Sequence, residues 1–185
     1  MSAPTGPAPG AEPNTPNGGG QNGAAPAETA SAADRLQYRM LWLGLAIALL
    51  IGVLDRLSKW WLLDVYGLAT RPPTRLGDYL NLVMVWNQGV SFGLLAGSAS
   101  WHRLLLAGFA VIVAIVLAAA LPRTRSPWVA TALGLVVGGA LSNAWDRLVY
   151  GAVADFIDVH IGLYHWYTFN IADVAISVGA ALLIF

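Results

Sequence analysis

Four long apolar segments constrain what this chain can fold into more than any other feature of its sequence. A helix needs roughly 20 apolar residues to cross the hydrocarbon core of a bilayer, and the first three segments approach that length. The segments are Met40–Leu54, whose helix is expected to continue to about residue 63, then Leu104–Leu121, Pro127–Trp145 and Ile171–Phe185. The last would reach only about 22 Å as a helix, so we expect it to begin earlier or to continue past Phe185 in the natural chain. The pattern predicts an all-α membrane protein with four transmembrane helices.

The composition agrees with a bilayer environment. The chain is 57% hydrophobic and 11% charged, whereas an ordinary soluble domain is about 25% charged. Its formal net charge of zero argues against a nucleic-acid partner, which would require a basic surface. The absence of cysteine excludes disulfides, thiolate metal ligands and cysteine nucleophiles.

The N-terminal region differs in composition from the rest of the chain. Residues 1–37 are rich in Ala, Pro and Gly, and such a segment buries too little apolar surface to offset the entropy of ordering it. It has no basic stretch followed by an apolar one, so it does not read as a signal peptide. We predict a disordered cytoplasmic tail over residues 1–37 and a membrane domain over residues 38–185.

Ionisable residues gather at one end of the predicted spans. Asp55 and Lys59 lie near the end of the first span, Asp146 and Arg147 at the end of the third, and Asp173 at the start of the fourth. Because successive spans alternate in direction, these positions all face the same membrane surface. A charge near hydrocarbon is costly and is usually paired and functional, so the clustering indicates an active site.

Two longer connections are expected on that same surface. Residues 78–86 are rich in strand formers, Asn87-Gln88-Gly89 follows as a turn, and residues 90–95 resume the strand pattern, which predicts a small β-hairpin. Residues 150–169 are rich in aromatic side chains. Such rings favour the interface between headgroups and lipid tails, and a simple aromatic belt is an equally good explanation of them.

Arginine placement gives a weak indication of orientation. Four arginines flank the ends of the spans opposite the ionisable cluster, and three lie in loops on the side of the cluster. The first group is Arg35, Arg39, Arg123 and Arg125, and the second is Arg71, Arg75 and Arg103. Because cytoplasmic loops carry the excess of basic residues, this favours a cytoplasmic N-terminus and an extracytoplasmic site.

Asp155 and Asp173 are the candidate catalytic pair. Two carboxyl groups held close together cannot both ionise cheaply, so they share a proton. The ionised member can then take a proton from water while the protonated member polarises a peptide carbonyl. The alternative is structural: Asp155 would cap a turn, and Asp173 would sit in the first turn of a helix, where the dipole favours a carboxylate.

The other polar residues of the cluster are expected to support the site. Asp55 and Lys59 are four apart on a helix and can form an ion pair. Asn143 and Arg147 share a helix face, where Arg147 can hold a carboxylate and Asn143 can donate to backbone, while Asp146 can pair with Arg147 or another neighbour. Asn87 and Gly89 suit either a turn or substrate contact. Ser58 and Lys59 point about 100° apart, which disfavours a Ser/Lys dyad, and the three histidines lack metal-ligand spacing.

Together these segments resemble the bacterial lipoprotein signal peptidases, the signal peptidase II family. The matching stretches are DRLSK at 55–59, WNQGVSFG at 86–93, GGALSNAWDRL at 138–148, VADFID at 153–158 and FNIADVAI at 169–176. They occur in the family's order between four spans, and the resemblance covers residues 38–185. Each motif alone is weak, but five in order are specific.

The resemblance implies an aspartic endopeptidase of the bacterial inner membrane that needs no metal or cofactor. It implies cleavage of diacylglyceryl-modified prolipoproteins on the N-terminal side of the lipidated cysteine, sensitivity to globomycin, and Asp155 and Asp173 as catalytic residues. The positions that match supporting or substrate-contacting residues are Asp55, Lys59, Asn87, Gly89, Asn143, Asp146, Arg147 and Asn170. A monomer is expected, in contact with membrane lipid and substrate.

The sequence departs from the family pattern at three positions. Ser58 stands where Thr is frequent, Ser142 where Gly is usual, and Val174 where Ser is common. None of these changes removes a carboxylate. Two other functions remain open from the residues alone: a proton-coupled transporter, which would favour polar residues near the midplane and an internal repeat, and a non-catalytic membrane assembly factor. A cleavage assay distinguishes all three.

Overall fold

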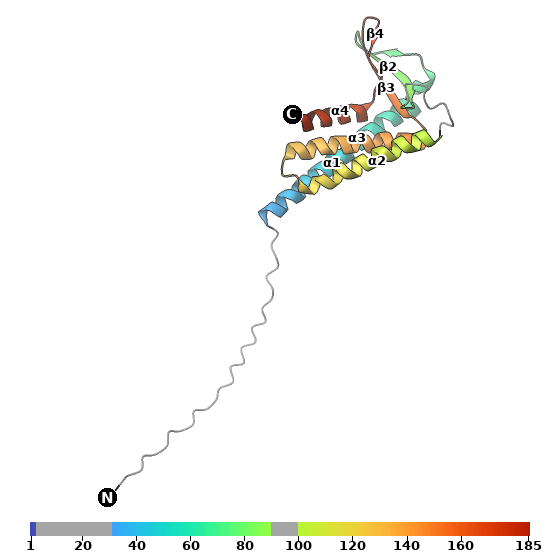
Figure 1. Ribbon diagram of the computed structural model, residues 1–185. Helices are drawn as coiled ribbons and strands as arrows, with labels where there is room; N and C mark the ends of the chain where they lie inside the picture. Colours follow the sequence, from blue (N-terminus) through green and yellow to red (C-terminus); the bar gives the residue numbers. More distant parts are fainter. Residues whose placement is uncertain (3–30, 90–99) are drawn as a thin grey trace.

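Four helices packed side by side carry a small sheet at one end in the computed structural model, which describes residues 1–2, 31–89 and 100–185 (Figure 1). The helices are α1 (Ala32–Trp60), α2 (Ser100–Ala120), α3 (Pro127–Val149) and α4 (Ile171–Ile184). Helix α3 lies at the centre and contacts the other three. The predicted all-α membrane architecture with a small β element is confirmed.

Small residues allow α3 to take this central position. A Cβ atom at Gly134 would lie 2.5 Å from the carbonyl oxygen of Gly44, and one at Gly138 would lie 2.5 Å from that of Ala48. Only glycine permits such close approach of two helix backbones, as the small-xxx-small spacing of these residues predicts. As a result most of the inner face of α3 is buried.

Three of the helical segments are long and apolar enough to cross a membrane, judged by length and composition. They cover residues 32–65, 101–123 and 127–149 of the described chain. Helix α4 is shorter, with 14 residues, and reaches about 21 Å. The second, third and fourth spans lie where the apolar segments predicted them, although α3 continues past Trp145 to Val149.

Helix α1 begins earlier than the composition predicted. Ser31 caps it by accepting from the backbone N–H of Asp34, whose side chain accepts in return from the backbone N–H of Ser31. This capping box satisfies two of the otherwise unpaired N–H groups at the helix start. Residues 32–37, which the expected tail included, are therefore helical. At its other end α1 passes into a π-helical turn, η1 (Trp61–Val65), followed by η2 (Leu68–Thr70).

The sheet contains four antiparallel strands in the order β1-β2-β3-β4. They are β1 (Thr74–Arg75), β2 (Leu80–Asn87), β3 (Val153–Ile161) and β4 (Tyr164–His165). The strand predicted at 78–86 is present as β2. Its described partners are β1 and β3. The predicted second strand of the hairpin, residues 90–95, lies outside the described residues. β2 and β3 pair from Leu80 opposite Val159 to Asn87 opposite Val153.

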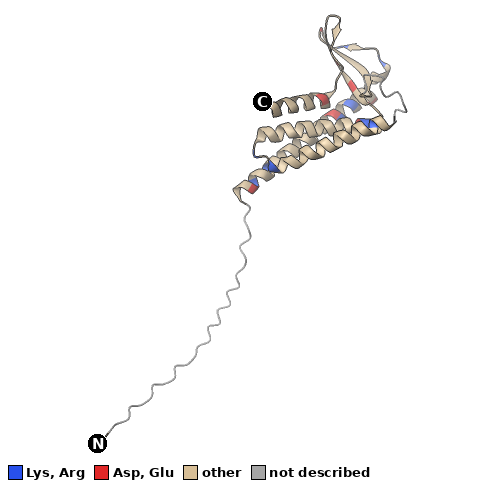
Figure 2. Cartoon of the chain, viewed as in Figure 1, with Lys and Arg blue, Asp and Glu red and all other residues tan. Residues whose placement is uncertain are grey.

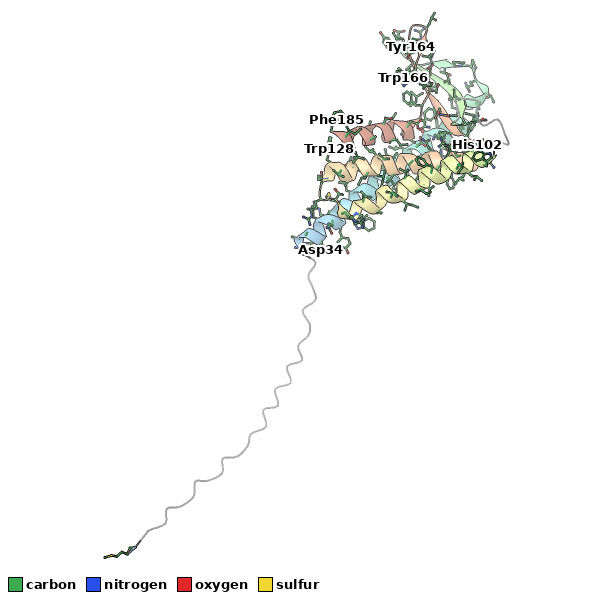
Figure 3. All side chains as sticks on the ribbon, in the orientation of Figure 1. Asp34, His102, Trp128, Tyr164, Trp166 and Phe185 are labelled. Atoms are coloured by element: carbon green, nitrogen blue, oxygen red, sulfur yellow. The ribbon has the colours of Figure 1, made fainter. Side chains whose placement is uncertain are left out.

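The aromatic segment 150–169 supplies β3 and β4, two of the four strands, which its composition did not predict. Its β-branched residues Val153, Ile157, Val159 and Ile161 belong to β3, and β-branched residues fit a pleated, half-buried surface. Large side chains on the β3–β4 hairpin are exposed, Tyr164 and Trp166 among them (Figure 3). Tyr164 lies near the tip of the hairpin far from the helices (Figure 3), and exposed aromatic rings are in keeping with the aromatic-belt interpretation.

Candidate active site

Charged residues concentrate at the end of the bundle that carries the sheet (Figure 2). A second, smaller group lies at the start of α1 and near the α2–α3 connection, where η3 (Leu121–Arg123) joins the two helices. The middle of the bundle is apolar. The alternation of spans therefore predicted the location of the ionisable cluster correctly.

Asp155 lies on β3 and is only 1% exposed. Its Oδ2 accepts from Asn87 Nδ2 on β2 at 2.9 Å, and its Oδ1 accepts from Asn170 Nδ2 at 2.6 Å. Burial raises the pKa of Asp155 to about 6, the hydrogen bond from Asn87 opposes the rise, and the charge of Asp173 adds to it. The residue is part of a strand, so the interpretation of Asp155 as a turn cap is wrong.

Asp173 lies in the first turn of α4 and is half-buried. Its Oδ1 accepts from Asn143 Nδ2 on α3 at 2.7 Å, and its Oδ2 accepts from the backbone N–H of Asn170 at 3.3 Å. The second contact is half of a capping box, so the expected helix-start geometry is present. The bond from Asn143 is additional and directs one oxygen of this carboxyl group toward α3.

Asn170 connects the two aspartates. It is fully buried, and its Nδ2 donates to Asp155 while its Oδ1 accepts from the backbone N–H of Asp173 at 2.9 Å. Its Nδ2 also lies 3.2 Å from Asn143 Oδ1. Residues from β3, α3 and the start of α4, far apart in the sequence, therefore meet around one amide side chain.

A buried ion cluster lies beside the aspartates. Lys59, 1% exposed, donates to Asp55 Oδ2 and to Asp146 Oδ2, both at 2.6 Å. Arg56 donates to the other oxygen of Asp146, and Ser142 Oγ donates to Asp55 Oδ2 at 2.6 Å. Two cations balance two carboxylates, which matters because removal of one partner from a buried pair costs about 3–5 kcal/mol.

The predicted Asp55–Lys59 pair is confirmed, and Asp146 is its third member rather than a partner of Arg147. Arg147 donates through Nη1 to the backbone carbonyl of Asn143 at 3.2 Å. The expectation that Arg147 holds a carboxylate is therefore wrong for this structure. Asn143, expected to donate to backbone, donates to the side chain of Asp173 instead.

Asn87 and Gly89 form the turn that the sequence allowed for them, and their contact with substrate, the other role left open, stays a prediction. The backbone N–H of Gly89 donates to Asn87 Oδ1 at 2.8 Å, and Gly89 has a φ of 78°, a value that glycine adopts without strain. This turn orients the amide of Asn87 so that its Nδ2 points to Asp155. The turn is thus part of the site.

Sequence reasoning missed two members of the ion cluster. Arg56 was overlooked because it follows Asp55 directly, and adjacent helical residues do not face each other; its partner is on another helix. Ser142 was noted only as a departure from a family pattern, yet its hydroxyl contacts Asp55.

Among the described residues no group of three or more His, Cys, Asp or Glu side chains is arranged to hold a metal ion.

The geometry suits acid–base chemistry on a peptide bond. Asp155 and Asp173 are close enough for the charge of Asp173 to raise the pKa of Asp155. Such a pair can hold one proton between two carboxyl groups, which provides a base for water and an acid for the carbonyl oxygen. The surrounding asparagines donate to the carboxylates and hold their orientation.

Comparison with known proteins gives consistent matches. A family model described as signal peptidase (SPase) II matches residues 47–185. A lipoprotein signal peptidase of Methylocella silvestris is 43% identical over 143 residues, covering 77% of this chain and 84% of the relative. The one from Methylobacterium sp. (strain 4-46) is 46% identical and covers 77% and 87%.

Two solved structures share the fold. Both are described as bacterial membrane enzyme structures by the in meso method. One aligns with a TM-score of 0.64 at 28% identity, covering 76% of this chain and 89% of that one. The other has a TM-score of 0.63 at 26% identity and covers 76% and 84%.

Proposed function

The chain belongs to the signal peptidase II family, and from that membership we propose that Asp155 and Asp173 form the pair of carboxyl groups that performs its hydrolysis. As a member of this family it is an aspartic peptidase that acts on prolipoproteins, and its apolar helices make it a multi-pass membrane protein. The observation that carries the assignment is the contact of Asn170 with both aspartates.

The pair activates water in this proposal. One ionised carboxyl group takes a proton from the water molecule as its oxygen adds to the scissile carbonyl carbon, and the protonated carboxyl group donates to the carbonyl oxygen. Collapse of the tetrahedral intermediate breaks the C–N bond and returns a proton to the leaving amine. Because the two groups interact, their apparent pKa values belong to the pair. The raised pKa of Asp155 supports a shared proton near neutral pH.

The remaining polar residues support the pair. Asn87 and Asn170 orient Asp155, and Asn143 orients Asp173. Gly89 shapes the turn that presents Asn87. Asp55, Lys59 and Asp146 tie the ends of α1 and α3 together beside the pair. Arg147 bonds to the backbone carbonyl of Asn143, the residue that orients Asp173. No metal or cofactor takes part in this mechanism.

The proposed substrate is a diacylglyceryl-modified prolipoprotein, cut N-terminal to the lipidated cysteine. Its signal helix lies among the spans while its acyl chains remain in lipid. We place the enzyme in the bacterial inner membrane as a monomer with the site at the extracytoplasmic face. Four arginines at the opposite ends of the helices support this orientation. In this orientation the N-terminus lies on the cytoplasmic side.

A gel-shift assay with purified protein and a lipidated prolipoprotein tests this function. The wild type cleaves the lipidated substrate, globomycin inhibits cleavage, and Asp155→Asn and Asp173→Asn are each inactive although folded. Asp158→Asn is the matched control, since Asp158 is a buried carboxylate on the same strand that contacts Asn81 and His165 instead. Near-normal cleavage by either Asp155→Asn or Asp173→Asn contradicts the assignment.

A further inference from the structure

The two carboxylates of the buried ion cluster each hold the backbone beside one proposed catalytic residue. Asp55 Oδ1 accepts from the backbone N–H of Ala172 at 3.1 Å, and Asp146 Oδ2 accepts from the backbone N–H of Ala154 at 3.2 Å. Ala172 directly precedes Asp173, and Ala154 directly precedes Asp155. All four of the contacting residues are buried.

Lys59 connects Asp55 to Asp146 and so links these two backbone contacts. Its ammonium group bonds Asp55 and Asp146 at equal distances of 2.6 Å, and among the described residues no other cation donates a hydrogen bond to both. Arg56 donates to Asp146 but lies 3.7 Å from Asp55. A continuous path of hydrogen bonds therefore runs from the backbone before Asp173, through Lys59, to the backbone before Asp155.

We propose that Lys59 is a positioning residue that fixes the separation of the two catalytic aspartates by tying Asp55 to Asp146. The proposal rests on the assignment of Asp155 and Asp173 as the catalytic pair. The two hydrogen bonds of Lys59 in the described chain go to Asp55 and Asp146 rather than to the catalytic pair, and its charge adds a small lowering of the pKa of Asp155. Lys59 acts through two carboxylates whose backbone partners belong to different elements, α4 and β3.

The chemistry of the cluster explains why an ammonium group suits this place. An ammonium group donates in three directions from one atom, so it can draw two carboxylates together at a single point. Those carboxylates would otherwise repel each other in a site from which water is excluded. Ser142 donates to Asp55 and not to Asp146. The hydroxyl therefore holds only the carboxylate that contacts Ala172, whereas Lys59 holds both carboxylates.

The first test is Lys59→Met, with Arg56→Met as its matched control. Arg56→Met removes a cation from the same cluster but leaves the bridge. The proposal predicts that Lys59→Met lowers kcat by about 10²-fold, the loss expected for a 1 Å misplacement of reacting groups, with KM changed less than about threefold. Arg56→Met keeps kcat within about fivefold of the wild type. Equal losses of kcat in the two variants overturn the proposal.

A second variant tests the proposal if Lys59→Met does not fold. Lys59→Met combined with Asp55→Asn leaves Arg56 and Asp146 as a balanced pair and retains an amide oxygen to accept from Ala172. This variant folds without the bridge, and the proposal predicts the same loss of kcat per folded molecule. A folded double variant with wild-type kcat overturns it. Cleavage by Asp155→Asn instead contradicts the proposed function, so the two failures are distinguishable.

Discussion

Gly139→Ala tests how closely the position of Asp173 depends on contact between α3 and α4. A Cβ atom at Gly139 would lie 2.5 Å from the carbonyl oxygen of Ala172 and 2.8 Å from Cγ1 of Ile176. Ordinary contact begins at 3.4 Å, so the added methyl group is short of room by about 0.9 Å. The nearer atom belongs to backbone and cannot rotate away, which forces the first turn of α4 to move.

The expected effects follow from that displacement. Overpacking of this kind costs about 1–3 kcal/mol of stability. A shift of about 1 Å in a reacting group lowers the rate by about 10²-fold, because Asp173 follows Ala172 directly. We therefore expect Gly139→Ala to fold, to unfold at lower temperature, and to cleave lipidated prolipoprotein about 10²-fold more slowly, with both quantities measured on purified protein in the same lipid environment.

Gly108→Ala is the matched control. It lies in α2, and a Cβ atom there would meet nothing within 4 Å. The same change at this position should leave the cleavage rate unchanged and should not lower stability, since alanine favours a helix by up to about 1 kcal/mol over glycine. A Gly139→Ala variant with wild-type rate and unfolding temperature would refute the reasoning.

Two further predictions follow from side-chain contacts. Asn87→Ala removes a hydrogen bond that lowers the pKa of the buried carboxyl group on β3, so the limb of the pH profile of kcat/KM near pH 6 should move to higher pH. Asn81→Ala, whose partner on β3 is a different carboxylate, should leave that limb in place; equal shifts would contradict the assignment. Ser142→Ala should lower the free energy of unfolding by about 1.5–3 kcal/mol, as expected for a buried hydrogen bond to a charged group. Ser58→Ala loses only a bond to the backbone carbonyl of Asp55 and should lower the free energy of unfolding by less. Equal losses in the two variants would contradict a larger contribution from the buried bond to the Asp55 carboxylate.

The helices could be predicted from sequence because each depends on a local pattern. The apolar run at 104–121 predicts the position of α2, and Pro127 predicts the first residue of α3. Alternation of direction then predicts that Asp55, Asp146 and Asp173 share one membrane surface. These inferences need only spacing and hydrophobicity.

The sheet and the ion cluster could not be predicted in the same way. The longer of the two partners of β2 is β3, which lies beyond two transmembrane helices in the sequence, and no local signal specifies that pairing. Aromatic residues obscured the strand character of β3, because rings near a membrane have an alternative explanation. The bond from Ser142 to Asp55 joins helices α3 and α1 and depends on their packing.

A double-mutant cycle on Asp155→Asn and Asp173→Asn tests the central claim most directly. The single-turnover cleavage rate of a lipidated prolipoprotein is measured for the wild type, both single variants and the double variant. Groups that act as one unit have non-additive effects. We expect each single change to reduce the rate by at least about 10²–10⁴-fold and the double variant to be no slower than the slower single variant. Losses that multiply in the double variant, or a single variant that retains most of its activity, would contradict a shared role for the two carboxyl groups.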